Sequence, residues 1–123
     1  MFDERYLEYV ELFNERCFYD CHEVLEDLWL DNNGPSRRFY QGLIHFATAF
    51  QHLLRRNMAG FESRLNSTQD YLAPYQDHYE GLNVVAIRQA IACWKERLAR
   101  RSEGEILPFD DAAIPILKLE QSP

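Results

Sequence analysis

The sequence predicts an all-α fold: a single bundle of about five helices with an extended C-terminal tail. Apolar residues recur every three or four positions in five segments, which is the spacing of amphipathic helices. Short stretches containing Asn, Gly and Pro separate these segments and indicate turns between helices. The chain has 123 residues, 46% of them hydrophobic, with 8 Phe and 7 Tyr, so it can bury one core as a single domain, residues 1–123.

The first two helices are expected at about residues 3–16 and 20–31. The second begins with Asp20 and has Glu23 three residues later, a pattern typical of a capping box. The apolar stripe of the first helix contains Phe2, Tyr6, Tyr9, Val10, Phe13 and Cys17. The stripe of the second helix contains Phe18, Cys21, Leu25, Leu28 and Trp29.

The third and fourth helices are expected at about residues 36–56 and 60–73. Pro35 suits the first position of the third helix, where no N–H is required. Gly42 lies inside that helix, where glycine costs about 1 kcal/mol relative to alanine, so it indicates a close contact between helices. The core-facing residues of these two helices are Phe39, Leu43, Phe46, Phe50, Leu53 or Leu54, Phe61, Leu65, Thr68 and Leu72.

Residues 74–83 are expected to form a polar, aromatic loop, with Asn83 capping a fifth helix at about residues 84–101. The tail, residues 102–123, contains Pro108 and Pro115 and therefore cannot be one long helix. Because the apolar residues of the tail must be covered, it packs either on the outside of its own bundle or on a neighbouring subunit.

The net charge of −7 is unevenly distributed along the chain. Residues 1–33 carry ten acids and two arginines, a net −8, and residues 34–65 carry five arginines and one glutamate, a net +4. Either the acidic segment pairs with the basic one across the bundle, which we favour, or the basic segment forms a face for phosphates or RNA. The overall negative charge argues against nucleic acid as a partner because it repels polyanions. The five arginines are Arg37, Arg38, Arg55, Arg56 and Arg64.

The cysteine content and the lack of long apolar segments favour a cytoplasmic protein. No stretch approaches the ~20 apolar residues needed to cross a bilayer, and the acidic N-terminal residues do not fit a secretory signal. Three cysteines are too few, and odd in number, for a disulfide framework. Cys17 and Cys21 are expected to be buried as small hydrophobic residues and not to form a redox pair.

Two rows of polar side chains form the candidate site. His22 and Glu26 are one turn apart on the second helix, beside the stripe that leads to Trp29. If a second row on the third helix faces them, the imidazole and carboxylate groups would suit a divalent metal such as zinc, iron or manganese. The residues of this second row are Gln41, His45, Thr48 and His52.

Two well-specified metal signatures do not fit the sequence. The zinc-protease pattern HExxH requires a second histidine where this chain has Glu26, and no histidine has a glutamate three residues before it, as a di-iron bundle requires. The alternative is a buried polar network in which His22 and Glu26 satisfy each other or an arginine such as Arg37 or Arg38. The residues alone leave both interpretations open.

Several segments, in order, carry a resemblance to a known family: Phe13-Asn14, Phe18, His22-Glu23-Val24-Leu25-Glu26-Asp27-Leu28-Trp29, Arg38-Phe39-Tyr40-Gln41-Gly42-Leu43-Ile44, His52, Arg55 to Asn57, Gly60 and Gly81-Leu82-Asn83-Val84. Over about residues 10–85 the chain resembles the bacterial and archaeal proteins known as domain of unknown function 309. The resemblance implies an all-helical bundle and no established activity. By position, it places the family's polar signature on His22, Glu23, Glu26, Gln41, His52 and Asn57.

The chain departs from the family pattern at three positions. His45 stands where members often have glutamine, which weakens its case as a ligand. Arg56 replaces the glycine of an Arg-Gly-Asn turn between the third and fourth helices. Asn83 replaces an aspartate, a conservative change for a helix cap.

Three functions follow from these observations. We favour a non-catalytic binding or assembly module that forms a homo-oligomer, most simply a dimer. The second is a metal-binding or small-ligand-binding protein, hydrolytic if Glu23 acts as a general base, with His22, Glu26 and His52 as metal ligands. The third is nucleic-acid binding through the arginines. The sequence leaves open whether the protein is an enzyme and which ligand or metal it would use.

Overall fold

The computed structural model describes residues 2–102 and 113–120. Within them it contains five helices and a two-stranded hairpin, so the all-α prediction is confirmed, and each helix lies within two residues of its predicted bounds. The elements are α1 (Glu4–Asn14), α2 (Phe18–Asp31), α3 (Arg37–Leu54), α4 (Met58–Leu72), β1 (His78–Tyr79), β2 (Leu82–Asn83) and α5 (Val84–Ser102).

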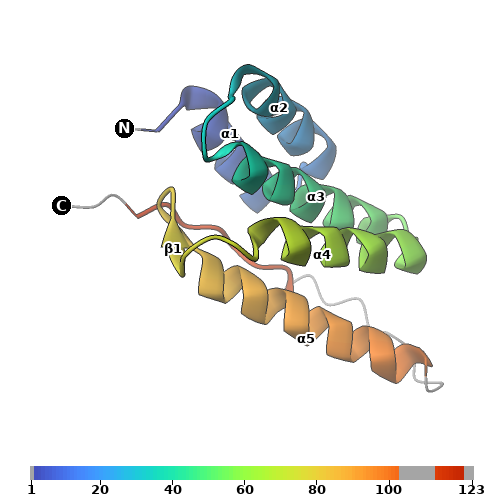
Figure 1. Ribbon diagram of the computed structural model, residues 1–123. Helices are drawn as coiled ribbons and strands as arrows, with labels where there is room; N and C mark the ends of the chain where they lie inside the picture. The colour runs from blue at the N-terminus through green and yellow to red at the C-terminus, as the bar shows by residue number, and fades with distance from the viewer. Residues whose placement is uncertain (1, 103–112, 121–123) are drawn as a thin grey trace.

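Helix α3 is the centre of the molecule. It lies between α2 and α4 and contacts both (Figure 1). Its inner side packs on α1, where Phe13 stacks on Phe46 with ring centroids 5.4 Å apart. It also packs on α5, where Phe50 meets Trp94 at 6.3 Å. The aromatic side chains therefore meet between helices, as their spacing along the sequence predicts, and α2, α3 and α4 share an outer surface turned away from α1 and α5.

The capping box predicted at Asp20 and Glu23 is wrong. α2 begins at Phe18, and its N-cap residue Cys17 makes no side-chain capping hydrogen bond. Phe18 belongs to the helix because its ring is buried edge-on against Phe13, with centroids 5.1 Å apart. Asp20 therefore lies inside the first turn, where its charge suits the helix dipole, and Glu23 is available for other contacts.

The cysteine prediction is confirmed at one position and wrong at the other. Cys21 is buried, and burial raises the pKa of its thiol, so it packs as a small hydrophobic residue. Cys17 is exposed because it lies in the turn between α1 and α2. Its sulfur is 3.8 Å from the carbonyl oxygen of Glu15.

The start of α3 also differs from the prediction. The helix begins at Arg37 with Ser36 as the N-cap residue, so Pro35 does not take the first helical position. The chain instead turns before the helix, with the N–H of Arg37 donating to the carbonyl of Gly34 at 3.2 Å. The hydroxyl of Tyr75 donates to the carbonyl of Pro35 at 2.7 Å and holds this turn in place.

The prediction that Gly42 marks a close contact between helices is confirmed. A Cβ on Gly42 would lie 2.9 Å from Cδ2 of Leu72, so the glycine permits a close contact between α3 and α4. Arg56 has a φ of 61°, a left-handed conformation that ends α3. Asn57 then caps α4 by accepting a hydrogen bond from the N–H of Gly60 at 3.0 Å.

The segment expected to be a loop contains a small hairpin. β1 pairs with β2, and the two residues between the strands, Glu80 and Gly81, both have positive φ, 48° and 76°, as a type I′ turn requires. The carboxylate of Glu80 accepts a hydrogen bond from the hydroxyl of Ser36 at 2.9 Å, which ties the hairpin to the start of α3. Asn83 accepts a hydrogen bond from the N–H of Ala86 at 3.0 Å, so its predicted role as the cap of α5 is confirmed.

The described part of the tail packs on its own bundle. The side-chain amide of Asn14 donates to the carbonyl of Leu117 and accepts from its N–H, both at 2.8 Å. The indole of Trp94 donates to the carbonyl of Ala113 at 3.0 Å. Residues 113–120 therefore follow the first of the two alternatives for the tail, while residues 103–112 and 121–123 lie outside the described residues.

Candidate functional site

The first predicted row lies on α2. The Nδ1 atom of His22 is 2.8 Å from the backbone carbonyl of Tyr19, and the two rings meet edge to face with centroids 5.3 Å apart. Because a carbonyl only accepts, Nδ1 carries a proton, and in the neutral ring Nε2 has a free lone pair. Nε2 is 3.9 Å from the carboxylate of Glu26. These two side chains are therefore together, as predicted, at the surface of one helix.

Glu23 lies on the exposed side of the same helix. Its carboxylate is hydrogen-bonded to the hydroxyl of Tyr19, which raises the pKa of that tyrosine. A hollow of about 550 Å³ follows this part of the surface, and residues of α2 alone line it. Since a single helix forms it, the hollow has no opposite wall.

The second predicted row lies on α3 and turns toward α4. The side chain of Gln41 donates to the hydroxyl of Tyr71 at 2.8 Å. His45 stacks on the ring of Tyr71, with centroids 5.2 Å apart and 10° between planes. The guanidinium of Arg64 donates to Nδ1 of His45 at 3.1 Å. Burial, and secondarily the charge of Arg64, lower the pKa of His45, so this histidine is neutral at pH 7.

His52 ends this row at the turn between α3 and α4. The amide oxygen of Asn57 accepts from Gly60, so its NH₂ group faces Nδ1 of His52 at 3.2 Å. A Cβ on Gly60 would lie 2.9 Å from Cγ of His52, so the glycine makes room for the imidazole. Burial, followed by the charges of Arg64 and Arg55, lowers the pKa of His52.

The two rows lie on opposite sides of α3. The guanidinium of Arg37 lies 4.4 Å from the ring of Trp29, which places the Trp29 side of α2 next to α3. His22 is seven residues before Trp29, almost two full turns, and so lies on that same side. His52, by contrast, belongs to the α4 side of α3. Ile44 and Gln51, on the outer side of α3, separate the two rows. Thr48, the remaining member of the second row, donates a hydrogen bond from its hydroxyl to the carbonyl of Ile44 at 2.9 Å.

The predicted metal ligands are therefore not gathered. Among the described residues, no group of three or more His, Cys, Asp or Glu side chains is placed to hold a metal ion. His22 and Glu26 form a pair, and His52 is engaged by Asn57 on the other side of α3. Spacing along each helix identifies its polar row, but the neighbouring helices decide which way that row points.

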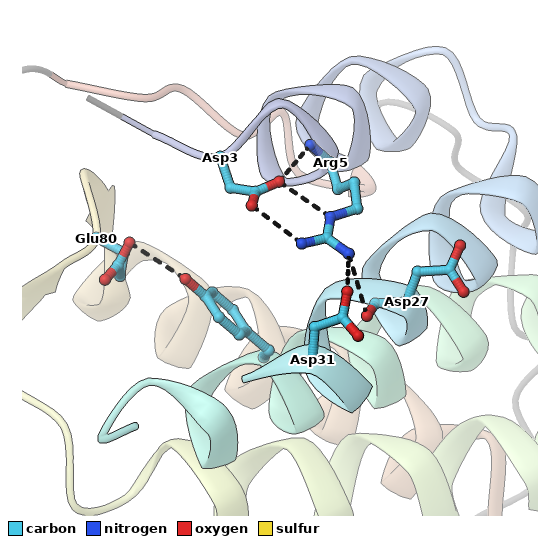
Figure 2. A network of polar contacts seen from close by, with 6 residues as sticks. Asp3, Arg5, Asp27, Asp31 and Glu80 are labelled. Carbon is cyan, nitrogen blue, oxygen red and sulfur yellow. Dashed lines mark hydrogen bonds and ion pairs between the residues drawn. The ribbon is translucent and has the colours of Figure 1, made fainter. Parts of the chain in front are cut away.

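The predicted pairing of the acidic segment with the basic one stays a prediction. In the acidic segment, Arg5 pairs with Asp3 at 3.1 Å and with Asp31 at 2.7 Å, which ties α1 to α2 (Figure 2). Two arginines of the basic segment have partners elsewhere. Arg38 lies 4.7 Å from the ring of Tyr71, and Arg64 binds the neutral His45.

The side chain that sequence reasoning missed is Tyr71. It joins the α3 row through Gln41, His45 and Arg38, and it lies on α4 next to Gly42. A usable signal was present in the sequence, because Gly42 indicates a close neighbour. That signal does not say which helix supplies the neighbour.

No helix in the described part of the chain has the length and apolar character needed to cross a membrane.

A protein from Bacillus subtilis (strain 168), described as uncharacterized protein YpuF, is 37% identical to this chain over 62 residues. This match covers 49% of the chain and 36% of the relative, so the chain spans about a third of the relative's length. The family model described as domain of unknown function (DUF309) matches residues 6–63, from α1 to the start of α4. Over these residues, a little under half of the chain, the sequence matches the DUF309 family model, in agreement with the resemblance.

Proposed function

We propose that the protein is a non-catalytic helical assembly module that forms a homodimer through the outer surface of α2, α3 and α4. The observation that carries this proposal is a stripe on α2 that contains two uncovered large apolar side chains. Tyr19 is 53% exposed and Leu30 is 57% exposed. Glu23 and Glu26 lie between them at one-turn intervals, so the four side chains follow one line along the helix.

A single exposed apolar residue on a protein surface is ordinary. Two such residues at the ends of one helical stripe are typical of a helix that docks on another surface. The stripe spans twelve residues, Tyr19 to Leu30, about 16 Å at the rise of an α-helix, which is long enough for several turns to engage a partner. We define the docking face as the outer surface formed by Tyr19, Glu23, Glu26, Leu30, Arg38, Gln41, Ile44, Thr48, Arg64 and Tyr71.

The contacts of the polar rows also support a structural, non-catalytic role for them. Gln41 is bonded to Tyr71, His45 to Arg64, and His52 to Asn57. Groups satisfied by their own protein orient the helices and leave the α3 row without a substrate-facing acid or base.

The test is the oligomeric state of the purified protein over a wide concentration range, measured by sedimentation equilibrium. A concentration-dependent dimer is expected. Replacing Tyr19 and Leu30 together by alanine should weaken the dimer at least tenfold, since each loses buried apolar surface. The matched control is Leu7→Ala, on α1, where the side chain is 43% exposed. A wild-type protein that stays monomeric at every concentration would exclude this function.

A second candidate, a metal-dependent protein, is favoured by the state of His22. Its Nδ1–H is held by the Tyr19 carbonyl, an arrangement that metal-binding histidines commonly show, and Nε2 is directed toward Glu26. Elemental analysis of untagged wild type and His22→Ala tests it. Near-stoichiometric zinc, iron or manganese that the variant lacks would favour the metal site. Equal, trace metal in both samples would exclude it.

A further inference from the structure

We infer that the homodimer has its two-fold axis along α3, so that the acidic α2 edge of each copy meets the basic α3–α4 edge of the other. This inference rests on the proposed function and adds the geometry of the interface. It begins with the charges at the two edges of the docking face. Glu23 and Glu26 are exposed on α2, while Arg38 and Arg64 lie along the seam between α3 and α4.

The basic seam is set apart from the acids of α4. The residues of α4 that face α3 are Gly60, Arg64 and Tyr71. Glu62 and Asp70 belong to the same helix but are turned away from these three residues, Glu62 by about 160° or more and Asp70 by about 80–120°, because successive residues of an α-helix are rotated by about 100°. The seam therefore presents positive charge to the docking face.

The acidic and basic residues also lie at matching heights along α3. Two contacts fix the register of α2: Phe18 meets Phe50, with ring centroids 5.7 Å apart, and Trp29 meets Arg37. The helices are thus antiparallel. If the residues between these two contacts are evenly spaced along both helices, Glu23 lies at the same height along the α3 axis as Ile44 and His45. Glu26 then lies at the height of Tyr40 and Gln41.

The register of α4 follows from its own contacts with α3. Arg64 binds His45, and Tyr71 binds Gln41 and lies under Arg38. Arg64 is therefore at the height of Glu23, and the guanidinium of Arg38 lies within about one helical turn of the height of Glu26. The two edges carry opposite charges at two shared levels, with α3 midway between them.

A two-fold axis parallel to α3 exchanges the two edges and preserves height. When two copies stack face to face about this axis, Glu23 of one meets Arg64 of the other, and Glu26 meets Arg38. Each such contact occurs twice, because a two-fold interface is isologous. The outer stripes of the two α3 helices, with Ile44 and Thr48, then meet at the centre.

The other face-to-face arrangement is disfavoured by the same charges. An axis perpendicular to α3 but still in the plane of the face would place α2 on α2 and α4 on α4. Glutamates would then face glutamates and arginines would face arginines, and like charges across an interface cost several kcal/mol. Charge complementarity therefore selects the axis along α3.

The face is large enough for a stable contact. α3 has 18 residues and is therefore about 27 Å long. With neighbouring helix axes about 8–10 Å apart, three helices span about 20 Å, a projected area of roughly 500 Å² before side-chain relief is added. Standard interfaces bury about 800 Å² of accessible surface per partner, which is of the same order.

The experiment uses paired charge reversal in the full-length protein. One variant is Glu23→Lys with Glu26→Lys, and the other is Arg38→Glu with Arg64→Glu. Each alone places like charges opposite each other and should weaken the homodimer about a hundredfold or more. An equimolar mixture of the two should form a heterodimer, because both contacts then join opposite charges. All four substitutions in one chain should restore the homodimer.

The matched control reverses Glu8 and Glu11, which are exposed on α1 outside the docking face, and it changes the net charge as much as the first variant does. The control should dimerise like wild type. Far-ultraviolet circular dichroism and thermal unfolding establish that every variant is folded. The four-substitution chain keeps the test decisive even if one two-residue variant is destabilised.

The outcomes separate the inference from the proposed function. Two results would overturn the pairing of α2 with the α3–α4 seam while leaving dimerisation intact. In the first, both charge-reversed variants dimerise like wild type. In the second, the variants lose the dimer, and neither their mixture nor the four-substitution chain restores it. A wild-type monomer at every concentration overturns both. If each two-residue variant loses the dimer, and the mixture and the four-substitution chain recover it, the result supports both the interface geometry and the proposed function.

Discussion

Glycine at position 56 should give a more stable protein than alanine at that position. Arg56 has a φ of 61° after the last turn of α3, a conformation that costs a side-chain-bearing residue about 1–2 kcal/mol. The backbone around it forms a complete Schellman motif. The N–H of Asn57 donates to the carbonyl of His52 at 2.9 Å, and the N–H of Arg56 donates to the carbonyl of Leu53 at 3.0 Å. Because the motif fixes this conformation, the backbone at residue 56 cannot adopt another φ to avoid the cost of the left-handed one.

The expected gain is the difference between two effects. Glycine removes the left-handed cost but adds about 0.5–1 kcal/mol of conformational entropy to the unfolded chain. Arg56→Gly should therefore exceed Arg56→Ala in free energy of unfolding by about 0.5–1 kcal/mol, or in Tm by about 2–5 °C for a domain of this size, because both variants lose the same side chain. Urea denaturation followed by circular dichroism measures it, at one fixed protein concentration for all variants.

Two further variants control for the side chain itself. Arg56→Ala removes the same side chain but keeps the left-handed cost, so it should not stabilise. Arg16 has a φ of 67° in an equivalent motif after α1, but its guanidinium donates to the carbonyls of Ile114 and Pro115 at 3.2 and 3.3 Å. Arg16→Gly loses these contacts, but it should still be more stable than Arg16→Ala, which loses them too and keeps the left-handed cost. Equal stabilisation by glycine and alanine at position 56 would refute the reasoning from backbone conformation.

Three other predictions concern packing, the tail and pH. Gly60→Ala should destabilise by about 1–3 kcal/mol in urea denaturation, because the added Cβ would press on His52 at 2.9 Å; unchanged stability would contradict the close contact. Asn14→Ala removes both hydrogen bonds to Leu117 and should cost about 1–3 kcal/mol, with faster amide hydrogen exchange in residues 113–120; unchanged exchange there would argue against the docking of the tail. Burial raises the pKa of Tyr40 to about 12, so the folded state retains this proton longer than the unfolded state, and stability should fall as pH rises from about 10 to 12 in thermal unfolding scans. Tyr40→Phe should reduce that fall.

The helices could be predicted closely because each carries a clear apolar stripe. Errors arose where one tertiary contact outweighed a local pattern. The capping box at Asp20 failed because burial of Phe18 extends α2 by two residues toward its N-terminus. The hairpin was missed because each strand has two residues, too few for an alternating pattern. In the sequence, only the pair Glu80-Gly81 indicates the turn of this hairpin.

The candidate site was less predictable than the fold. Spacing identified both polar rows correctly, and the His22–Glu26 pair forms as expected. Whether the two rows converge depends on how α3 is rotated about its own axis between α2 and α4. No local pattern in the sequence specifies that rotation. The close contact at Gly42 against Leu72 sets that rotation, and it turns Gln41 and His52 toward α4.

The polar residues that the resemblance singled out consequently divide into two groups with different expected effects. His52 is half enclosed and bonded to Asn57, so its role is to join α3 to α4. Glu26 is exposed, with His22 at 3.9 Å as its neighbour, and its role in our proposal is at the docking face. His52→Ala should lower the free energy of unfolding by about 1 kcal/mol and leave the intrinsic dimer affinity unchanged.

Glu26→Gln should weaken the dimer and leave the free energy of unfolding unchanged. Surface substitutions usually change stability by no more than about 0.5 kcal/mol, so this variant should unfold like wild type while its dimer dissociates more readily. Measuring both quantities for both variants, by urea denaturation and sedimentation, separates the two roles. If His52→Ala weakened association without changing stability, His52 would belong to the interface, and the pairing of Glu26 with Arg38 would not account for dimerisation. The contacts of His52 with Asn57 and Gly60 support the opposite result, because they place its ring inside the α3–α4 junction and not on the surface that a second copy would meet.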